Sequence, residues 1–182
     1  SWSMAKSFYA ALIGISIDRG EINGLDDKVN LYLDYFNDER SKITIRDLLN
    51  MSSGLEYPEN QHENMFFLND HLEYSKSIGV EKEANTVFEY NNVNSMLLGD
   101  ILEKATGKKA DLLLNERILD PIGVKNSTVW TDNTGNPLAY CCIDMSARDY
   151  SRFGLLFSRN GNWNGNQLIS KDFVDETFTE YW

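Results

Sequence analysis

The stretch that most restricts the fold is residues 94–108, NSMLLGDILEKATGK. Its apolar side chains recur at the spacing of one helix face, and Gly107 follows as a C-terminal stop signal. The face is formed by Leu97, Leu98, Ile101 and Leu102. A helix with an apolar stripe must bury that stripe against other elements. We therefore expect a packed helical core around this segment.

Further helices are predicted along the whole chain. The segments are 3–19, 45–51, 110–120, 146–161 and 170–182, and residues 25–33 predict a short amphipathic segment. Thr44, Ser146 and Ser170 each stand where a side-chain oxygen can cap the first turn of the following helix. Residues 127–130, STVW, predict one isolated extended piece. The pattern predicts about six helices and few strands, with the chain ending inside its last helix.

Residues 56–85 mix turn-forming residues with isolated apolar pairs. This composition predicts an irregular stretch with one short helix near 63–77. Long loops of this kind often wall a binding or active site.

Charge and composition exclude several classes of protein. A hydrophobic fraction of 42% in 182 residues fits one domain with a core, and the net charge of −11 is spread along the chain. An acidic surface repels nucleic acid and anionic lipid, so we expect neither as a partner. The sequence has no run approaching the roughly 20 apolar residues of a membrane span.

The cysteines and histidines predict no metal site. Cys141 and Cys142 are adjacent, and neighbouring residues rarely satisfy disulfide geometry, so we expect buried free thiols. His62 and His71 lie in no spacing typical of a zinc site. We expect both histidines to be exposed or hydrogen-bonded, not catalytic.

Ser3 stands three residues before Lys6, at the start of the predicted helix 3–19. Residues so spaced share one helix face, so the lysine amine can reach the hydroxyl group. Burial lowers the pKa of an amine, which can then accept the serine proton. The amides of the helix N-terminus favour negative charge on the serine oxygen, and the Ser3 N–H can supply half an oxyanion hole. This pair is a candidate nucleophile with its base.

A second candidate pair lies at Tyr90 and Asn92, where a loop meets a predicted helix start. The phenol and the amide are groups that could move a proton and hold the lysine in place. Tyr35 and Asn37 show the same spacing, but Tyr35 has apolar neighbours typical of packing.

Five segments in order resemble the serine β-lactamase and penicillin-binding protein superfamily. They are SWSMAKSF, ITIRDLLNMSSGL, FEYNNVNSMLLGDILEKATGK, ILDPIGVKNS and SARDYSRFGLLFSRNGNWNG. The chain is most similar to the branch that holds class C β-lactamases, esterases and aminohexanoate-oligomer hydrolases. AYCCIDMSARD, at 139–149, is similar to the aminohexanoate-hydrolase side of that branch.

The resemblance implies a role for each candidate residue. Ser3 corresponds to the acylated nucleophile and Lys6 to its partner in the S-x-x-K motif. Tyr90 corresponds to the tyrosine that passes a proton to the leaving group, and Asn92 to the amide that contacts substrate and orients the lysine. No metal or other cofactor is implied.

The resemblance also implies an α+β fold, the β-lactamase/transpeptidase-like fold. In it, a mostly helical domain interrupts a domain built on an antiparallel sheet. Residues 1–182 match mainly the helical domain and its flanking helices, so we expect a partial hydrolase domain that lacks sheet strands at both ends. The family's third motif, Lys or His then x-Gly on a strand, is absent from this sequence. Losing the oxyanion donor of that strand typically costs on the order of 3 to 4 kcal/mol, so the isolated segment is expected to be nearly inactive.

The resulting hypothesis is a serine hydrolase that forms an acyl-enzyme on an ester, amide or β-lactam carbonyl of a small molecule or short peptide. The alternatives are a non-hydrolytic penicillin-binding sensor or peptidoglycan-ligand domain, and a helical interaction module. In this family, Tyr57 and the pair Phe66–Phe67 would lie at the lip of the pocket, and Trp2 would flank the nucleophile or pack on the sheet. The family favours the periplasm or cell envelope, with the cytoplasm as the other option. The sequence leaves the oligomeric state open.

Overall fold

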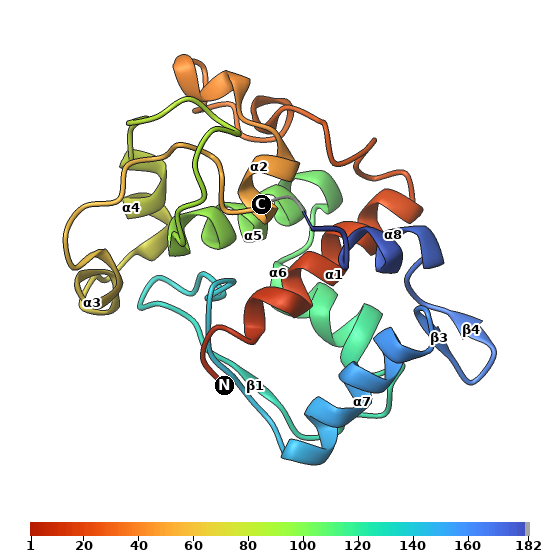
Figure 1. Ribbon diagram of the computed structural model, residues 1–182. Helices are drawn as coiled ribbons and strands as arrows, with labels where there is room; N and C mark the ends of the chain where they lie inside the picture. Colours follow the sequence, from red (N-terminus) through yellow and green to blue (C-terminus); the bar gives the residue numbers. More distant parts are fainter. Residues whose placement is uncertain (181–182) are drawn as a thin grey trace.

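The structure is a computed structural model that describes residues 1–180. Two long helices, α1 (Ala5–Asp18) and α5 (Asn92–Thr106), form its centre (Figure 1). The side chain of Asn91 caps α5 by accepting from the Val93 N–H at 3.0 Å, and Gly107 ends it with a left-handed φ of 71°. The helix and the stop predicted at 94–108 are confirmed.

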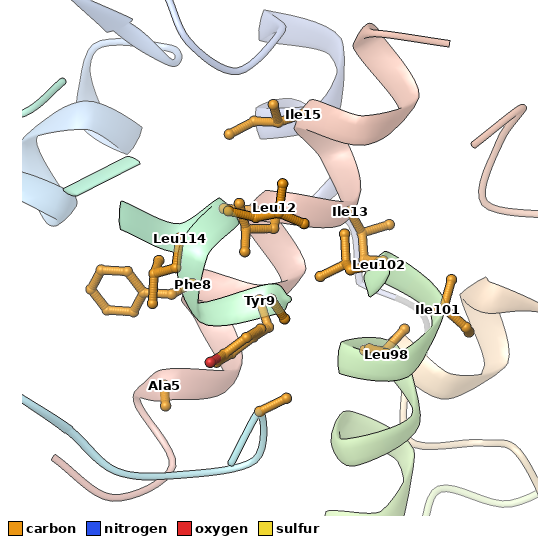
Figure 2. Packing of buried hydrophobic residues seen from close by; sticks show 14 of the residues in the cluster. Ala5, Phe8, Tyr9, Leu12, Ile13, Ile15, Leu98, Ile101, Leu102 and Leu114 are labelled. Carbon is orange, nitrogen blue, oxygen red and sulfur yellow. The ribbon is translucent and has the colours of Figure 1, made fainter. Parts of the chain in front are cut away.

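The hydrophobic core fills the space between these two helices. Figure 2 shows Ile13 of α1 facing Leu102 of α5, while Leu12 lies on the side of α1 toward Leu114, and all of them are buried. Ile101 lies beside Leu102 on α5. Because the residues of α1 from Ala11 to Ser16 are all buried, this helix is held from several sides.

Shorter helices surround the central pair. They are α2 (Ile45–Leu49), α6 (Ala110–Leu114), a π-helical turn at Asn115–Leu119, α7 (Ala147–Ser158) and α8 (Lys171–Glu176). The three caps predicted from the sequence are confirmed, and Thr44 forms a full capping box with Asp47. α8 ends at Glu176, so the prediction of a helix over 170–182 is too long, and its last two residues lie outside the described part.

Gly14 allows α8 to pack closely against α1. A Cβ atom at this position would lie 2.4 Å from the ring of Phe173, well inside van der Waals contact. The Phe173 ring is itself buried. The glycine is therefore required by packing, not by helix propensity.

The loop region folds differently from the prediction. The single helix expected near 63–77 is two helices, α3 (Gln61–Phe66) and α4 (His71–Ser77). Asp70 separates them because its extended backbone breaks the helix and its carboxylate accepts from the Glu73 N–H at 2.8 Å.

The segment 25–33 contains only one short 3₁₀ turn, Val29–Leu31, and a second such turn spans Glu39–Lys42.

Strands are few and short among residues 1–180. β1 (Thr128–Val129) pairs antiparallel with β2 (Ile143–Asp144). The predicted extended piece is confirmed over two residues, but it is not isolated. β3 (Asn162–Trp163) pairs with β4 (Asn166–Gln167). The loop between β1 and β2 lies beside the N-terminal end of α1 (Figure 1).

Cys141 and Cys142 form a disulfide with each other. The expected burial is confirmed, since both side chains are at most 4% exposed, but the expected free thiols are wrong. Cys142 adopts a left-handed φ of 75°, which is uncommon for a residue other than glycine. The sequence gives no sign of this conformation.

No helix within the described residues is long and apolar enough to cross a membrane.

Candidate active site

Ser3 and Lys6 lie at the N-terminal end of α1. Ser3 is exposed in the turn just before the helix, and its carbonyl accepts from the Lys6 N–H at 3.1 Å. The Lys6 Nζ donates to the Ser3 Oγ at 3.0 Å. The helix therefore begins two residues later than predicted, yet the side chains meet as the spacing indicated.

The Lys6 amine has two further partners, both fixed by the fold. Its Nζ donates to Asn92 Oδ1 at 2.8 Å and to the carbonyl oxygen of Tyr140 at 2.7 Å. Asn92 is the first residue of α5 and is buried, so the packing of α1 on α5 sets this contact. Burial lowers the pKa of Lys6, and hydrogen bonding and attraction from Tyr90 only partly oppose this.

Tyr90 approaches the same pair from the loop before α5. The Lys6 Nζ lies 4.9 Å from the centre of the Tyr90 ring. Burial acts to raise the pKa of the Tyr90 phenol, but the polar side chains of Ser3 and Lys6 and the Lys6 charge outweigh burial and bring the pKa below its usual value. Tyr90 precedes the helix and does not begin it, since α5 starts at Asn92.

The Tyr140 carbonyl is held in place by a network behind it. The buried Tyr140 hydroxyl group lies 2.9 Å from His71 Nδ1, and His71 Nε2 lies 3.2 Å from the Leu68 carbonyl oxygen. A carbonyl only accepts, so Nε2 carries the proton, Nδ1 accepts, and the phenol donates. Gly99 of α5 lets this loop approach, because a Cβ atom there would lie 2.9 Å from the Cβ of Ala139.

His62, on α3, contacts the other end of the Asn92 amide. The His62 Nδ1 lies 2.8 Å from Asn92 Nδ2. The imidazole ring packs edge-on against Tyr90 and Tyr57, with ring centres 5.7 Å and 5.4 Å away. Burial and the Lys6 charge lower the pKa of His62, and the Glu63 carboxylate opposes them.

Aromatic side chains line one edge of the cluster. Trp2 is 70% exposed and packs edge-on against Phe66 of α3, with ring centres 5.5 Å apart. Phe66 also contacts the Tyr140 ring, whereas Phe67 points to solvent and is 87% exposed. Trp2 and Phe66 thus form an apolar rim next to Ser3.

The four candidate residues are therefore brought together from two stretches of the chain, 3–6 and 90–92. Sequence reasoning missed the Tyr140 carbonyl, because a backbone group leaves no signal in residue identity. It also missed the contact of His62, which lies 30 residues from Asn92 with no helical or strand spacing between them. Within residues 1–180, no group of three or more His, Cys, Asp or Glu side chains is placed to hold a metal ion.

Comparison with known proteins identifies the family of the chain. The Beta-lactamase family model matches residues 1–180, and the chain belongs to this family. The resemblance and the fold class predicted from the five segments are thereby confirmed.

Individual relatives carry several names. The chain is 30% identical over 138 residues to a D-aminopeptidase from Brucella anthropi, a match that covers 71% of this chain and 26% of that protein. A structure from Bacillus anthracis, proposed to be a 6-aminohexanoate-dimer hydrolase, superposes with a TM-score of 0.88 at 26% identity and covers 96% of this chain and 51% of that one. The octameric penicillin-binding protein homologue from Pyrococcus abyssi, at 20% identity and a TM-score of 0.79, shares the fold over 98% of this chain and 48% of its own.

The chain thus spans about a quarter of the length of the curated relatives and about half of the Bacillus anthracis structure.

Proposed function

We propose that this chain carries the nucleophile and proton-transfer groups of a serine hydrolase that forms an acyl-enzyme on an ester, amide or β-lactam carbonyl. Ser3 is the nucleophile, Lys6 its base and Tyr90 the group that protonates the leaving group. Asn92 orients Lys6 and contacts the substrate. The described residues form the helical part of that hydrolase domain.

The set of partners around the Lys6 amine is the observation that carries this proposal. Asn92 Oδ1 and the Tyr140 carbonyl can only accept hydrogen bonds, so each requires an N–H from Lys6. A neutral amine has two N–H groups and one lone pair. Its lone pair is then left facing the third partner, the Ser3 Oγ, whose hydroxyl group can donate. This is the geometry that a general base needs.

The reaction then follows from these contacts. As the Ser3 Oγ attacks the carbonyl carbon, its proton passes to the Lys6 Nζ, and the Ser3 Oγ–carbonyl bond forms. The proton moves through Tyr90 to the leaving group, whose bond to the carbonyl carbon breaks. A water oxygen then bonds to the acyl carbon, and its proton passes along the same groups to the Ser3 Oγ. The bond from Ser3 Oγ to the acyl carbon breaks, which releases the acid and restores the serine.

The names of the relatives narrow the substrates to test. A D-aminopeptidase acts on amide bonds, and other similar proteins carry the names amidohydrolase and carboxylesterase. We therefore propose an amide of a D-amino acid and a simple p-nitrophenyl ester as the first two assay substrates.

Covalent labelling of the intact gene product tests the proposal. We expect a fluorophosphonate or penicillin probe to add one equivalent to the peptide that contains Ser3, and the substitution Ser3→Ala to abolish this. Ser151→Ala is the matched control, because Ser151 is an exposed serine whose Oγ bonds to the backbone of its own helix α7. Undiminished labelling of the Ser3 variant would reject the assignment.

Turnover distinguishes a serine hydrolase from a non-hydrolytic penicillin-binding sensor, since both form an acyl-enzyme. A hydrolase releases many equivalents of p-nitrophenol per chain, whereas a penicillin-binding sensor gives a burst of one equivalent and stops.

A further inference from the structure

Both polar atoms of the Asn92 side-chain amide have a hydrogen-bond partner. Its Oδ1 accepts from Lys6 at 2.8 Å, and its Nδ2 lies 2.8 Å from His62 Nδ1. An amide nitrogen only donates, so the His62 Nδ1 must be an acceptor, which requires a neutral imidazole protonated at Nε2. A neutral His62 and a correctly oriented Asn92 therefore require each other.

The orientation of this amide matters for the base. If the amide rotated by half a turn, its NH₂ group would face Lys6 in place of Oδ1. The lone pair of a neutral Lys6 would then accept from the amide instead of from the Ser3 hydroxyl group. A charged Lys6 ammonium would face the amide NH₂ group, and since both groups only donate, no hydrogen bond could form between them. In either state, the rotated amide stops Lys6 from taking the Ser3 proton.

We propose that His62 is a positioning residue that locks the Asn92 amide with Oδ1 toward Lys6, and that protonation of His62 releases this lock. The proposal rests on the proposed function, since it concerns the same reaction. His62 touches neither Ser3 nor Lys6 through a hydrogen bond and acts through Asn92.

The surroundings of His62 determine when the lock opens. An imidazolium carries a proton on Nδ1, which would confront the Asn92 NH₂ group and favour the half-turn rotation. The Lys6 charge opposes this protonation, and the Glu63 carboxylate on the same helix favours it. From the neighbouring segments, the phenol rings of Tyr57 and Tyr90 cover the imidazole. We expect acylation to fall as the pH drops below the ordinary histidine value of about 6.5.

Two substitutions separate positioning from mere packing. His62→Asn places an amide oxygen near the position of Nδ1, so it keeps an acceptor for Asn92 but does not titrate. His62→Phe keeps an aromatic ring against Tyr57 and Tyr90 but removes the acceptor. Circular dichroism and thermal melting check that both variants fold.

The pH dependence of Ser3 labelling and of p-nitrophenyl ester hydrolysis gives the result. For His62→Phe we expect kcat to fall about tenfold, the typical effect of one lost hydrogen bond, with KM within about threefold of the parent. For His62→Asn we expect nearly full kcat near pH 7. At acid pH this variant should show only the loss that follows protonation of Lys6, without the further loss that protonation of His62 causes in the parent. A His62→Phe variant with the parent's kcat and pH profile would overturn the proposal, as would a His62→Asn variant no better than His62→Phe.

A spectroscopic measurement tests the role of His62 without depending on whether the chain is a hydrolase. Nitrogen-15 NMR of the imidazole, assigned by the signal that disappears in His62→Asn, reports which ring nitrogen carries the proton. We expect the form protonated at Nε2 at pH 7, with Nδ1 bonded as an acceptor. Protonation at Nδ1 would reject the lock even if Ser3 is labelled normally. If Ser3 is not labelled but Nδ1 accepts as expected, the hydrolase assignment fails and the lock on Asn92 stands.

Discussion

The two ends of α1 differ in what surrounds them. At the N-terminal end, Ser3 is exposed, and the Lys6 amine bonds to Ser3 and to polar partners from two other segments. At the C-terminal end, every residue from Ala11 to Ser16 is buried, and Gly14 lies directly against the Phe173 ring. The apolar half fixes the helix in the core, and this lets the polar half hold a reactive pair at a constant distance.

This comparison predicts that substitutions at the two ends of α1 affect different properties of the protein. Changes at the polar end should reduce the rate and leave the free energy of unfolding nearly unchanged. Changes at the apolar end should do the reverse.

The largest effect is expected from Lys6→Met, which keeps the apolar stem and removes the amine. Loss of a general base typically costs a factor of 10² to 10⁴, so we expect kcat/KM for a p-nitrophenyl ester to fall by about 10³. Urea unfolding should change by less than about 1 kcal/mol, because losing the amine's hydrogen bonds is offset by removing the cost of its partial burial. A variant that unfolds much more easily would show that the two ends are not separate.

Tyr90→Phe should have a smaller effect, which depends on the leaving group. The phenol is needed to protonate a poor leaving group, so hydrolysis of an amide should fall on the order of 10². An ester that releases p-nitrophenolate needs no such proton and should lose much less. Equal losses on the two substrates would argue against proton delivery by Tyr90. Tyr35→Phe serves as a control, since its hydroxyl group bonds to Asp100 on α5.

Gly14→Ala should give the smallest change, confined to stability. The added methyl group would collide with the Phe173 ring at 2.4 Å, and overpacking typically costs about 1 to 3 kcal/mol. Gly154→Ala in α7 is the matched control, because its added methyl group meets no heavy atom within 4 Å. We expect thermal melting to separate the two variants while the Ser3 labelling rate of both stays at the parent level. A slower Gly14→Ala reaction would contradict the separation.

The part of this architecture that could be predicted from the sequence is the part encoded locally. The helix at 94–108 follows from its apolar stripe and Gly107, and the meeting of Ser3 with Lys6 follows from their spacing. The division between α3 and α4 was missed because it depends on the extended backbone and capping bond of Asp70, which the mixed composition of residues 56–85 does not reveal.

The contacts between distant segments could not be derived from local patterns. Tyr90 and Asn92 were placed near Lys6 only through the family resemblance, since 86 residues separate Lys6 from Asn92. The Tyr140 carbonyl depends on the packing of Ala139 against Gly99, which a pattern of residue types does not encode. The disulfide of Cys141 and Cys142 depends on the left-handed backbone of Cys142.

The most direct test of the central claim is the protonation state of Lys6 measured against the reactivity of Ser3. The pKa of Lys6 can be followed by carbon-13 NMR at Cε, and the rate of Ser3 labelling can be measured over the same pH range. Because burial lowers the pKa of Lys6, we expect it to titrate below the ordinary lysine value, with the labelling rate rising along the same curve. Full labelling at a pH where Lys6 remains fully charged would contradict the account.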